Sequence, residues 1–303
     1  MSKSPINKIQ SIPITQENPI VLDTNQYPPF SIAMSVYIKD NAAFFDSALA
    51  SVINQSLKPS EIVLVVDGPV HDSIQKVIEK YSEICIEKGI RLITNKLDVN
   101  GGLGNSLRIA VEIAAYDIIA RMDSDDIASF NRFELQLEYM LSHPDVDIVG
   151  GQIIEFLGSF ENIVGKRVVP TSDIDLKYYL KYRCPFNHMT VMFKKKEILM
   201  VGNYLDWPYN EDFYLWIRMA LAGCIFANLP DTLVYARVGK DMYDRRGGWR
   251  YFKSEVKLQR FMLTNKVICL SSYIYNVIGR FIIQVLMPNK LRGFIFQKLF
   301  RNL

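Results

Sequence analysis

Between residues 30 and 142, short apolar runs alternate with longer stretches in which apolar residues recur at helical spacing. The apolar runs predict strands at Phe30–Tyr37, Glu61–Val66, Ile90–Thr94 and Asp117–Met122. The stretches after them predict helices at Ala43–Gln55, at Ser73–Lys88, from the Gly101–Gly104 turn to Ala115, and at Asn131–Ser142. Strands separated by helices of this length form right-handed βαβ units. We therefore expect an α/β fold with a mainly parallel central sheet flanked by helices.

The chain outside this alternating block is less regular. Residues 1–29 hold five prolines without a clear period, and we interpret them as an irregular N-terminal arm. After Gly150 the pattern is irregular until Asn210-Glu211-Asp212, which opens a predicted helix that contains Trp216.

Residues 267–287 form the most apolar window of the chain, with 15 hydrophobic residues among 21. Its length would permit a membrane span. However, polar residues recur at every fourth position and draw a narrow stripe along one helix face: Ser272, Asn276, Arg280 and Gln284. Because a charge in mid-span is costly, the pattern favours an amphipathic helix in a membrane interface over a spanning helix. A core helix packed on the main domain is the remaining alternative.

Composition and charge indicate which partners the chain could bind and add little to the prediction of its fold. The 303 residues are 49% hydrophobic and 22% charged, values that exclude bulk disorder. The net charge is +3, but residues 237–303 carry a net +11 and residues 1–236 a net −8. Such asymmetry indicates an anionic partner for the C-terminal tail, and the apolar content of the tail favours a membrane surface over nucleic acid. Four separated cysteines provide no zinc or redox pair, and the N-terminus lacks the apolar stretch of a signal peptide.

Candidate chemistry begins where the predicted strands end. Asp123, Asp125 and Asp126 follow a buried strand, and carboxylates so close together usually need a cation between them. Carboxylate oxygens suit Mg²⁺ or Mn²⁺, so this motif predicts a metal site with Asp125 as a ligand, against the alternative of a solvated acidic loop. Asp67 ends another strand, and ligands of such sheets bind beyond the carboxyl ends of the strands.

Two further motifs could contribute to a site. The Gly101-Gly102-Leu103-Gly104 turn lacks the dinucleotide-binding spacing, although a close backbone turn before a helix N-terminus is a fair neighbour for a phosphate. Asp212 opens a helix after Glu211, which is typical of acids at helix N-termini but also fits a general base. The aromatic residues around that pair could form a sugar-stacking wall: Trp207, Tyr209, Phe213, Tyr214 and Trp216. His188 is either an acceptor contact or a structural residue.

Taken together, these residues resemble the inverting family 2 glycosyltransferases with a GT-A fold. The resemblance covers nearly the whole chain after the arm and rests on SIAMSVY, EIVLVVDG, NGGLGNSLRIAVEIAAYDIIARMDSDD and YNEDFYLW. The RRGG motif and the basic tail after it are similar to the subgroup that builds bacterial O-antigen and capsule repeat units on a lipid carrier.

The resemblance implies roles for individual residues. Asp67 matches the acid that binds the uracil of a UDP-sugar, and Asp123 matches the acid near the ribose. Arg108 matches an arginine near the nucleotide, and Tyr37 is also expected to bind the UDP-sugar. Asp125 matches the acid that holds Mn²⁺ or Mg²⁺ on the diphosphate. Asp212 matches the catalytic base, with residues that bind or orient the acceptor beside it: Glu211, His188 and Trp216.

The resemblance also implies an organisation and an activity. An arm (1–29) would precede a GT-A domain (30–236), made of a Rossmann-like nucleotide-sugar half (30–126) and an acceptor half (127–236), and a basic amphipathic tail (237–303) would associate with the membrane. The expected reaction moves glucose or galactose from a UDP-sugar to a lipid-diphosphate-linked N-acetylhexosamine with a β linkage, in O-antigen or exopolysaccharide biosynthesis. The motif of processive synthases is absent after Asp212, which favours single transfers. The enzyme would be a peripheral protein on the cytoplasmic face of the bacterial inner membrane, with no nucleic-acid partner.

Two other functions fit part of the pattern. A nucleotidyltransferase also combines an α/β sheet with metal-binding carboxylates, but it releases diphosphate from a nucleoside triphosphate. A non-catalytic, membrane-bound sugar-binding protein would share the tail, but it has no need for the four acids at the predicted site: Asp67, Asp123, Asp125 and Asp212.

Overall fold

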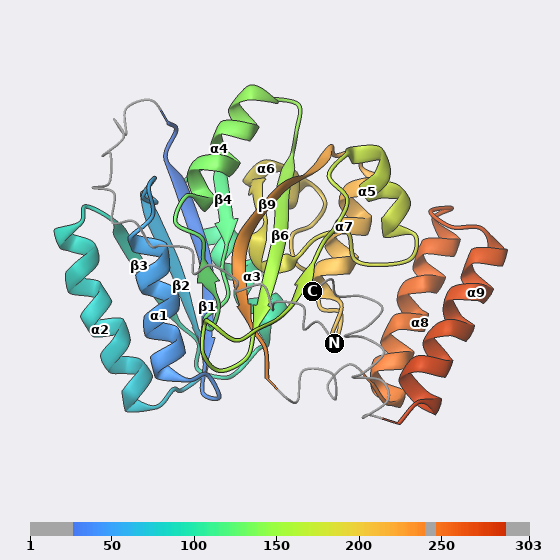
Figure 1. Cartoon of the computed structure of the whole chain (residues 1–303), viewed down its shortest axis with the longest axis horizontal. Helices are drawn as coiled ribbons and strands as arrows, with labels where there is room; N and C mark the ends of the chain where they lie inside the picture. The colour runs from blue at the N-terminus through green and yellow to red at the C-terminus, as the bar shows by residue number, and fades with distance from the viewer. Residues whose placement is uncertain (1–26, 240–246, 289–303) are drawn as a thin grey trace, which may run out of the picture.

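The computed structural model describes residues 27–239 and 247–288 (Figure 1). Its strands are β1 (Phe30–Tyr37), β2 (Glu61–Asp67), β3 (Arg91–Lys96), β4 (Ile118–Arg121), β5 (Ile127–Ala128), β6 (Ile148–Phe156), β7 (Ile163–Arg167), β8 (Met192–Lys194) and β9 (Phe226–Arg237). Its α-helices are α1 (Ala42–Ile53), α2 (Asp72–Glu87), α3 (Leu103–Ile113), α4 (Arg132–Ser142), α5 (Asp173–Leu180), α6 (Lys195–Met200), α7 (Glu211–Leu221), α8 (Trp249–Thr264) and α9 (Leu270–Phe281). A 3₁₀ turn, His188–Thr190, precedes β8, and a π-helical turn, Ile282–Leu286, follows α9.

All these strands belong to one sheet in the order β3-β2-β1-β4-β8-β6-β9-β5, with β7 paired to β6. The first four strands in this order are mutually parallel, as the alternating sequence pattern predicts. The other part of the sheet is mixed, because β8 pairs antiparallel with both β4 and β6, whereas β6 and β9 run parallel. The α/β fold class is therefore confirmed, with its parallel character concentrated in the N-terminal half.

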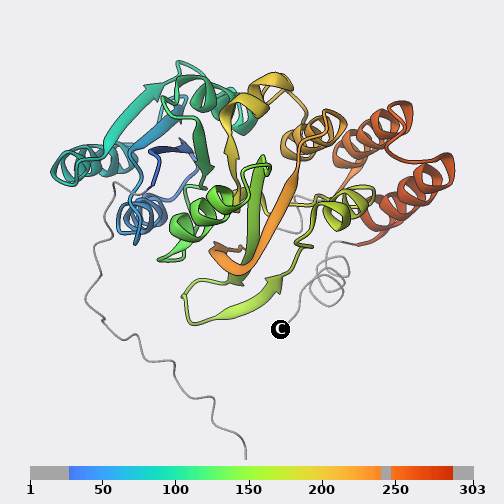
Figure 2. The same ribbon diagram turned by 90° about the horizontal axis from the view of Figure 1, so that it is seen from above.

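Helices cover both faces of the sheet (Figure 2). Alternate residues of β1 face opposite layers: Ile32 and Met34 pack in the core under α1, α2 and α4, and Ala33 packs in the core under α3 and α7. This alternation explains why apolar residues occur on both faces of β1 and β2, since a strand covered on both faces has no solvent side.

Local signals explain where the first elements begin and end. The Asn41 side chain caps α1 by accepting from the amides of Ala43 and Phe44 at 2.9 and 3.2 Å. Gly68 ends β2 with a φ of +82°, and a Cβ there would lie 2.8 Å from the amide nitrogen of Asn100. A glycine is therefore required at this turn for both conformational and steric reasons.

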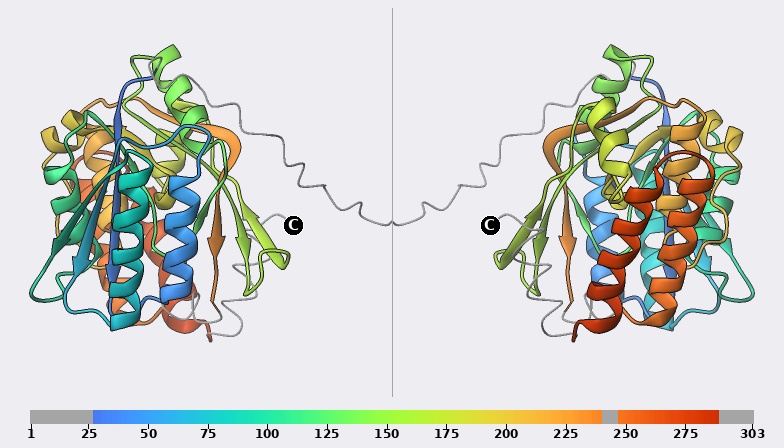
Figure 3. Two further views of the ribbon diagram at one scale, coloured as in Figure 1. Left: turned by 90° about the vertical axis from the view of Figure 1, so that its left-hand side faces the viewer. Right: turned by 90° about the vertical axis from the view of Figure 1, so that its right-hand side faces the viewer.

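The C-terminal part forms a hairpin of α8 and α9 at one end of the molecule, where both helices face the viewer in the right-hand view of Figure 3. The predicted helix in the 267–287 window is present, but the polar stripe does not face water or lipid headgroups. Asn276 and Gln284 are buried, and Arg280 is bonded to residues of the protein. The side of the helix that carries the stripe therefore packs on the protein, where Asn276 and Arg280 find hydrogen-bond partners on α8 and near α5.

Three sequence predictions concern residues that the structure does not describe: most of the arm (1–26), the Arg245-Arg246 part of RRGG, and the basic residues after Asn289. Within 27–239 and 247–288, none of the helices combines the length and the apolar character that crossing a membrane requires.

Candidate active site

The predicted site residues gather at the carboxyl edge of the parallel strands. Tyr37 and Asp67 are register partners at the ends of β1 and β2. The acidic segment that begins at Asp123 follows β4, which pairs with β1 on its other side. The sheet thus brings together three sequence segments that are about 30 to 55 residues apart.

Asp67 joins two motifs that were separate in the sequence. Its buried carboxylate accepts hydrogen bonds from the backbone amides of Gly101 and Gly102, at 2.6 and 2.9 Å. The Asn100 side chain adds a bond to the Asp67 carbonyl at 3.2 Å. Asp67 therefore holds the glycine turn in place, which determines how the N-terminus of α3 faces the sheet edge.

A cavity of about 460 Å³ lies beside this turn. Its walls come from the turn and α3, from the segment before α7, and from Glu211 at the start of α7: Gly101–Asn105, Arg108, Tyr204–Tyr209 and Glu211. Arg108 donates to Glu112 at 2.9 Å and to the Asn105 side chain at 2.9 Å, so its guanidinium is oriented along α3. A Cβ on Gly104 would lie 3.2 Å from the Glu211 Cβ, which shows how closely α3 and α7 approach.

Three carboxylates form an acidic cluster at the end of β4. Oxygens of Asp123, Asp125 and Asp126 lie within 4.8 Å of one another. Burial, followed by the charge of Asp123, raises the pKa of Asp125 to about 6 and raises the pKa of Asp126 well above its usual value. Burial also raises the pKa of the nearby Asp40, which accepts a hydrogen bond from Ser124 at 2.8 Å. A cation would relieve this repulsion, so a hard divalent ion fits the donor set.

Neighbouring groups hold the acidic cluster in place. The Arg121 guanidinium is buried and donates to both carboxylate oxygens of Asp123. Arg132 of α4 is also buried and donates to the Arg121 carbonyl at 2.7 Å, and burial lowers its pKa to about 9. On the other side, the Arg237 amide donates to Asp126 at 2.8 Å. The cluster is therefore anchored from β4, α4 and β9.

A second pair of acids opens α7. Burial, followed by the charge of Asp212, raises the pKa of Glu211 to about 7. Burial also raises the pKa of Asp212, although its carboxylate accepts a hydrogen bond from the Phe213 amide at 2.6 Å. A carboxyl group whose pKa is raised toward neutrality is suited to proton transfer. Both acids are therefore chemically competent as bases, and Glu211 also lines the cavity.

His188 contacts the second pair from the 3₁₀ turn. Its Nδ1 lies 3.8 Å from an oxygen of Asp212, and its Nε2 lies 2.8 Å from the Tyr204 hydroxyl. Burial, followed by the charge of Arg121, lowers the pKa of His188 well below its usual value, so the ring is neutral at pH 7. The Cys184 thiol also approaches Asp212, at 3.7 Å. Two neutral polar groups, the His188 ring and the Cys184 thiol, therefore lie beside the Asp212 carboxylate.

The aromatic wall expected around α7 is largely absent. Trp216 and Phe213 are buried in the core, with Trp216 packed edge-on against Phe186 and His188. Trp216 therefore cannot contact an acceptor directly, because helix α7 turns it toward the sheet. Trp207 and Tyr209 do line the cavity, and Tyr209 is exposed.

Sequence reasoning missed Arg121, Asp40 and Tyr204. Arg121 lay inside an apparently apolar strand, and a charged residue in such a run was the signal that could have singled it out. Asp40 lies three residues after the end of β1, and this position at the carboxyl end of a strand was the signal that could have singled it out. Tyr204 reaches the site only through long-range packing, and its local sequence carries no comparable signal.

Comparisons of sequence and of structure relate this chain to known proteins. The profile of the family "Glycosyl transferase family 2" matches residues 31–199. The chain is 37% identical to the amylovoran biosynthesis glycosyltransferase AmsE of Erwinia amylovora, over 89% of this chain and 98% of that protein. It is 35% identical to the UDP-Gal:alpha-D-GlcNAc-diphosphoundecaprenol beta-1,3-galactosyltransferase of Escherichia coli, over 91% of this chain and 98% of that protein. The crystal structure of S. aureus TarS 1-349 in complex with UDP-GlcNAc has a TM-score of 0.62 at 17% identity, covers 84% of this chain and 73% of that one, and shares the fold.

Proposed function

Because this chain belongs to glycosyl transferase family 2, we propose that it is a non-processive inverting enzyme that moves one hexose, glucose or galactose, from a UDP-sugar to a lipid-diphosphate-linked N-acetylhexosamine. The observation that carries this proposal is the convergence of three groups at one region of the fold: Asp67 with its glycine turn, the acidic cluster, and the Glu211–Asp212 pair beside a cavity.

The donor binds across the carboxyl edge of β1, β2 and β4 in this proposal. Asp67 and Tyr37 face the uracil, Asp123 lies near the ribose, and Arg108 lies near the nucleotide from α3. Asp67 then has a double role, since its carboxylate also anchors the amides of Gly101 and Gly102. A donor that contacts Asp67 would therefore also be sensitive to the position of the glycine turn.

The acidic cluster holds Mn²⁺ or Mg²⁺ in this proposal, with Asp125 as the principal ligand. Mg²⁺ is commonly held by one or two carboxylates together with substrate phosphates. When bound, the ion neutralises charge that develops on the departing diphosphate. Arg121 keeps Asp123 in a fixed orientation, so the cluster keeps its geometry when the donor enters and leaves.

The chemical step is a single displacement at the anomeric carbon. Asp212 accepts the proton of the acceptor hydroxyl as that oxygen forms a bond to the anomeric carbon. The bond from the anomeric carbon to the phosphate oxygen breaks at the same time, and UDP leaves with the electron pair. Attack from the opposite face converts the α-linked donor into a β-glycoside. Glu211 and His188 orient the acceptor, and Trp216 supports His188 from the core.

We further propose that the enzyme acts in O-antigen or exopolysaccharide biosynthesis as a peripheral protein on the cytoplasmic face of the inner membrane. The support is the function of the Escherichia coli relative, whose substrate is diphosphoundecaprenol-linked, together with the basic tail of this chain. A peripheral protein should be released from membranes by high salt or alkali, whereas a requirement for detergent would contradict this attachment.

A donor panel tests the proposal. UDP-glucose, UDP-galactose and UDP-N-acetylglucosamine are each incubated with a synthetic N-acetylglucosamine-diphospholipid and Mn²⁺, and both UDP release and the glycolipid product are measured. We expect one UDP-hexose to give UDP and a lipid extended by one β-linked hexose. Release of diphosphate from a nucleoside triphosphate would indicate a nucleotidyltransferase instead. No turnover with any donor and metal would favour a sugar-binding protein.

A further inference from the structure

A tight turn comes directly before the acid pair that opens α7. The Asn210 amide donates to the Trp207 carbonyl at 3.2 Å and closes a four-residue turn. Pro208 and Tyr209 are its central residues, and Tyr209 has a φ of +69°. A proline followed by a residue with positive φ is the pattern of a type II turn, in which glycine or asparagine is the usual third residue. A tyrosine at this position is therefore strained.

Tyr209 also has the accessible aromatic ring of the cavity beside the acid pair. Of the three aromatic residues that line this cavity in the described part of the chain, Tyr204 and Trp207 are buried. The Tyr204 hydroxyl is bonded to His188, and the Trp207 ring lies against Tyr214 with a centroid distance of 4.2 Å. Tyr209 is 53% exposed. A ligand in the cavity can therefore contact the Tyr209 ring directly, whereas the protein already packs against the other two rings.

Ser254 of α8 holds the strained turn in place. Its buried hydroxyl donates to the Pro208 carbonyl at 2.5 Å and accepts from the Asn210 side chain at 3.3 Å. These two partners are the residues immediately before and after Tyr209. The Ser254 carbonyl also accepts from the Trp207 indole nitrogen at 3.4 Å. Strained backbone persists only where its surroundings determine it, and here one serine provides contacts on both sides of the strained residue.

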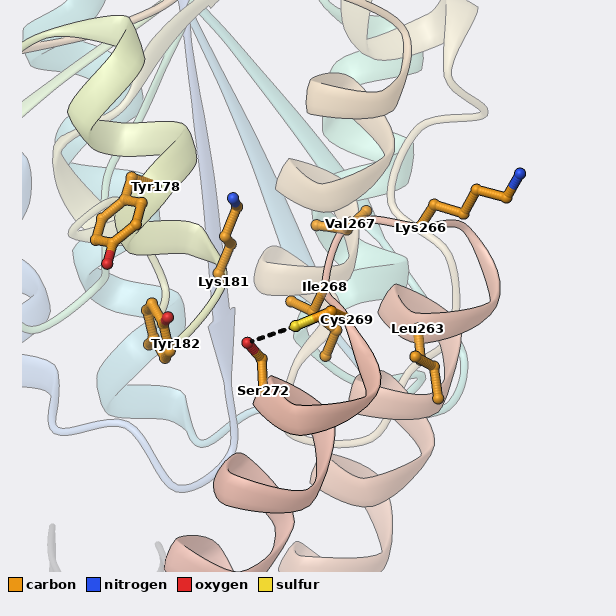
Figure 4. Close-up of a pocket in the computed structure, with 9 residues that line it drawn as sticks. All are labelled: Tyr178, Lys181, Tyr182, Leu263, Lys266, Val267, Ile268, Cys269 and Ser272. Atoms are coloured by element: carbon orange, nitrogen blue, oxygen red, sulfur yellow. Dashed lines mark hydrogen bonds between the residues drawn. The ribbon is translucent and has the colours of Figure 1, made fainter.

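Helix α8 is itself held by α9. Glu255, next to Ser254, accepts from Arg280 of α9 at 2.5 Å. Gln259, one turn further along α8, accepts from Asn276 at 2.8 Å. Packing is looser at the loop end of the hairpin, where a cavity of about 490 Å³ lies between the α8–α9 loop and the end of α5 (Figure 4). The polar bonds between the two helices therefore help to set the rotation of α8 that presents Ser254 to the turn.

We propose that Tyr209 is a binding residue for the acceptor sugar and that Ser254 is the positioning residue that holds it in its strained turn. The inference rests on the proposed function, in which an acceptor hydroxyl approaches Asp212. Tyr209 lies two residues before Glu211 on the cavity wall, so a sugar against its ring is next to the acid pair. The C–H face of a pyranose packs on an aromatic ring, and tyrosine offers that surface at a small cost in side-chain entropy. A glycine would relax the turn but would remove this surface.

Tyr209→Gly separates the strain from the contact. Glycine adopts a positive φ without strain, so the thermal unfolding midpoint should not fall although the ring is lost. In calorimetry we expect the Kd for a short-chain N-acetylglucosamine diphospholipid to rise roughly tenfold, with the KM for the UDP-sugar unchanged. Tyr209→Phe keeps the ring and should bind the acceptor like wild type. Tyr209→Asn also tolerates left-handed backbone and repeats the test without a glycine.

Lys266→Gly is the matched control for this substitution. Lys266 has a φ of +59° and lines the cavity of Figure 4 rather than the cavity beside the acid pair. Its replacement relieves the same kind of strain, so stability should not fall and acceptor binding should equal that of wild type. An equal loss of acceptor binding in Lys266→Gly and Tyr209→Gly would overturn the proposed contact.

Ser254→Ala tests the positioning role. It should raise the acceptor Kd by roughly fivefold, and Ser254→Thr, which keeps a hydroxyl, should restore binding. In the Tyr209→Gly background, Ser254→Ala should have no further effect on acceptor binding, because the ring that it positions is absent. Ser272→Ala in the same hairpin is the control. Additive losses in the double variant would show that Ser254 acts independently of Tyr209 and would overturn its positioning role.

The measurements also separate the contact from the reaction. An unchanged acceptor Kd for Tyr209→Gly would remove Tyr209 from the acceptor site, and a raised KM for the UDP-sugar alone would place it on the donor side. A wild type that binds the acceptor but transfers no hexose from any UDP-sugar would contradict the proposed reaction. Weaker acceptor binding by Tyr209→Gly would in that case still support the contact.

Discussion

The Arg121 guanidinium donates to both carboxylate oxygens of Asp123 from a buried position two residues earlier in the chain. The charge of Arg121 also lowers the pKa values of Asp125, Glu211 and Asp212, in opposition to the burial that raises them. One buried cation therefore acts on both groups of acids, the proposed metal site and the proposed base.

Arg121→Met should raise the pKa values of both acid groups and shift the pH–rate profile toward higher pH. The free energy of unfolding should fall by about 3 kcal/mol, because removal of one partner leaves Asp123 without its buried counterion. Steady-state rates between pH 5.5 and 9 and chemical denaturation measure the two effects. Lys80→Met is the control, since it removes an exposed partner of Asp46 and should change neither quantity appreciably. An unshifted profile would show that Arg121 is only structural.

Removal of the metal should abolish hexose transfer. We expect no turnover in excess EDTA, recovery on addition of Mn²⁺ or Mg²⁺, and an equally inactive Asp125→Ala variant, because the acidic cluster loses a principal ligand. Titration calorimetry with Mn²⁺ should detect binding to the wild type and much weaker binding to the variant. Asp98→Asn, in an exposed loop, is the matched control. Full activity in the presence of the chelator would contradict the proposed metal site.

Asp212→Asn keeps the shape of the side chain and removes its basicity. General-base assistance is worth roughly 10² to 10⁴ in rate, so turnover should fall by about that factor while the affinity for the UDP-sugar changes little. Glu211→Gln should reduce turnover less if Glu211 only orients the acceptor. Calorimetric loss of donor binding in step with rate would assign Asp212 to the donor site. An inactive Glu211→Gln beside an active Asp212→Asn would exchange the two roles.

Glu211 should also make stability depend on pH. Its folded pKa of about 7 lies above the ordinary value of 4.5 for a glutamate, so the folded state binds the proton more tightly than the unfolded state. The contribution of this group to the free energy of unfolding therefore falls as the pH rises from about 4.5 to about 7. Glu211→Gln should be more stable relative to wild type at pH 8 than at pH 4.5. Urea denaturation at the two pH values measures the difference, and a constant difference would contradict the raised pKa.

Asp67→Asn should loosen the glycine turn and weaken donor binding. The amide keeps one acceptor oxygen in place of two, so one of the amides of Gly101 and Gly102 loses its partner. Loss of a buried hydrogen bond costs about 1 to 3 kcal/mol, so the affinity for UDP should fall by roughly five- to 150-fold. Calorimetry with UDP measures this, with Asp98→Asn again as the control. Unchanged affinity would remove Asp67 from the donor site.

The N-terminal half of the fold could be predicted from the sequence because its signals are local. The sequences of β1, β2 and β4 are apolar runs, and those of α1, α2, α3 and α4 have helical spacing. Parallel pairing then follows from the chain order, which brings Asp67 and the acidic cluster to the same edge. The acids themselves were visible because they directly follow the strands.

Only the tertiary structure decided how distant segments meet. The mixed half of the sheet depends on pairing of β6 with β8 and β9, strands far apart in the chain. The packing of α7 buries Trp216 in the core, whereas Glu211 of the same helix lines the cavity.

The sequence by itself determined the periodicity of α9 and the chemistry of its two sides, but not the direction in which each side points. An amphipathic helix can pack its apolar side against the protein, or it can turn its polar side inward to hydrogen-bond partners there. The periodicity of the sequence is the same in both cases. Here Glu255, Gln259 and backbone carbonyls near α5 offered partners to Asn276 and Arg280, so the polar side turned inward. That choice depends on groups contributed by other elements, and for this reason only the folded molecule could make it.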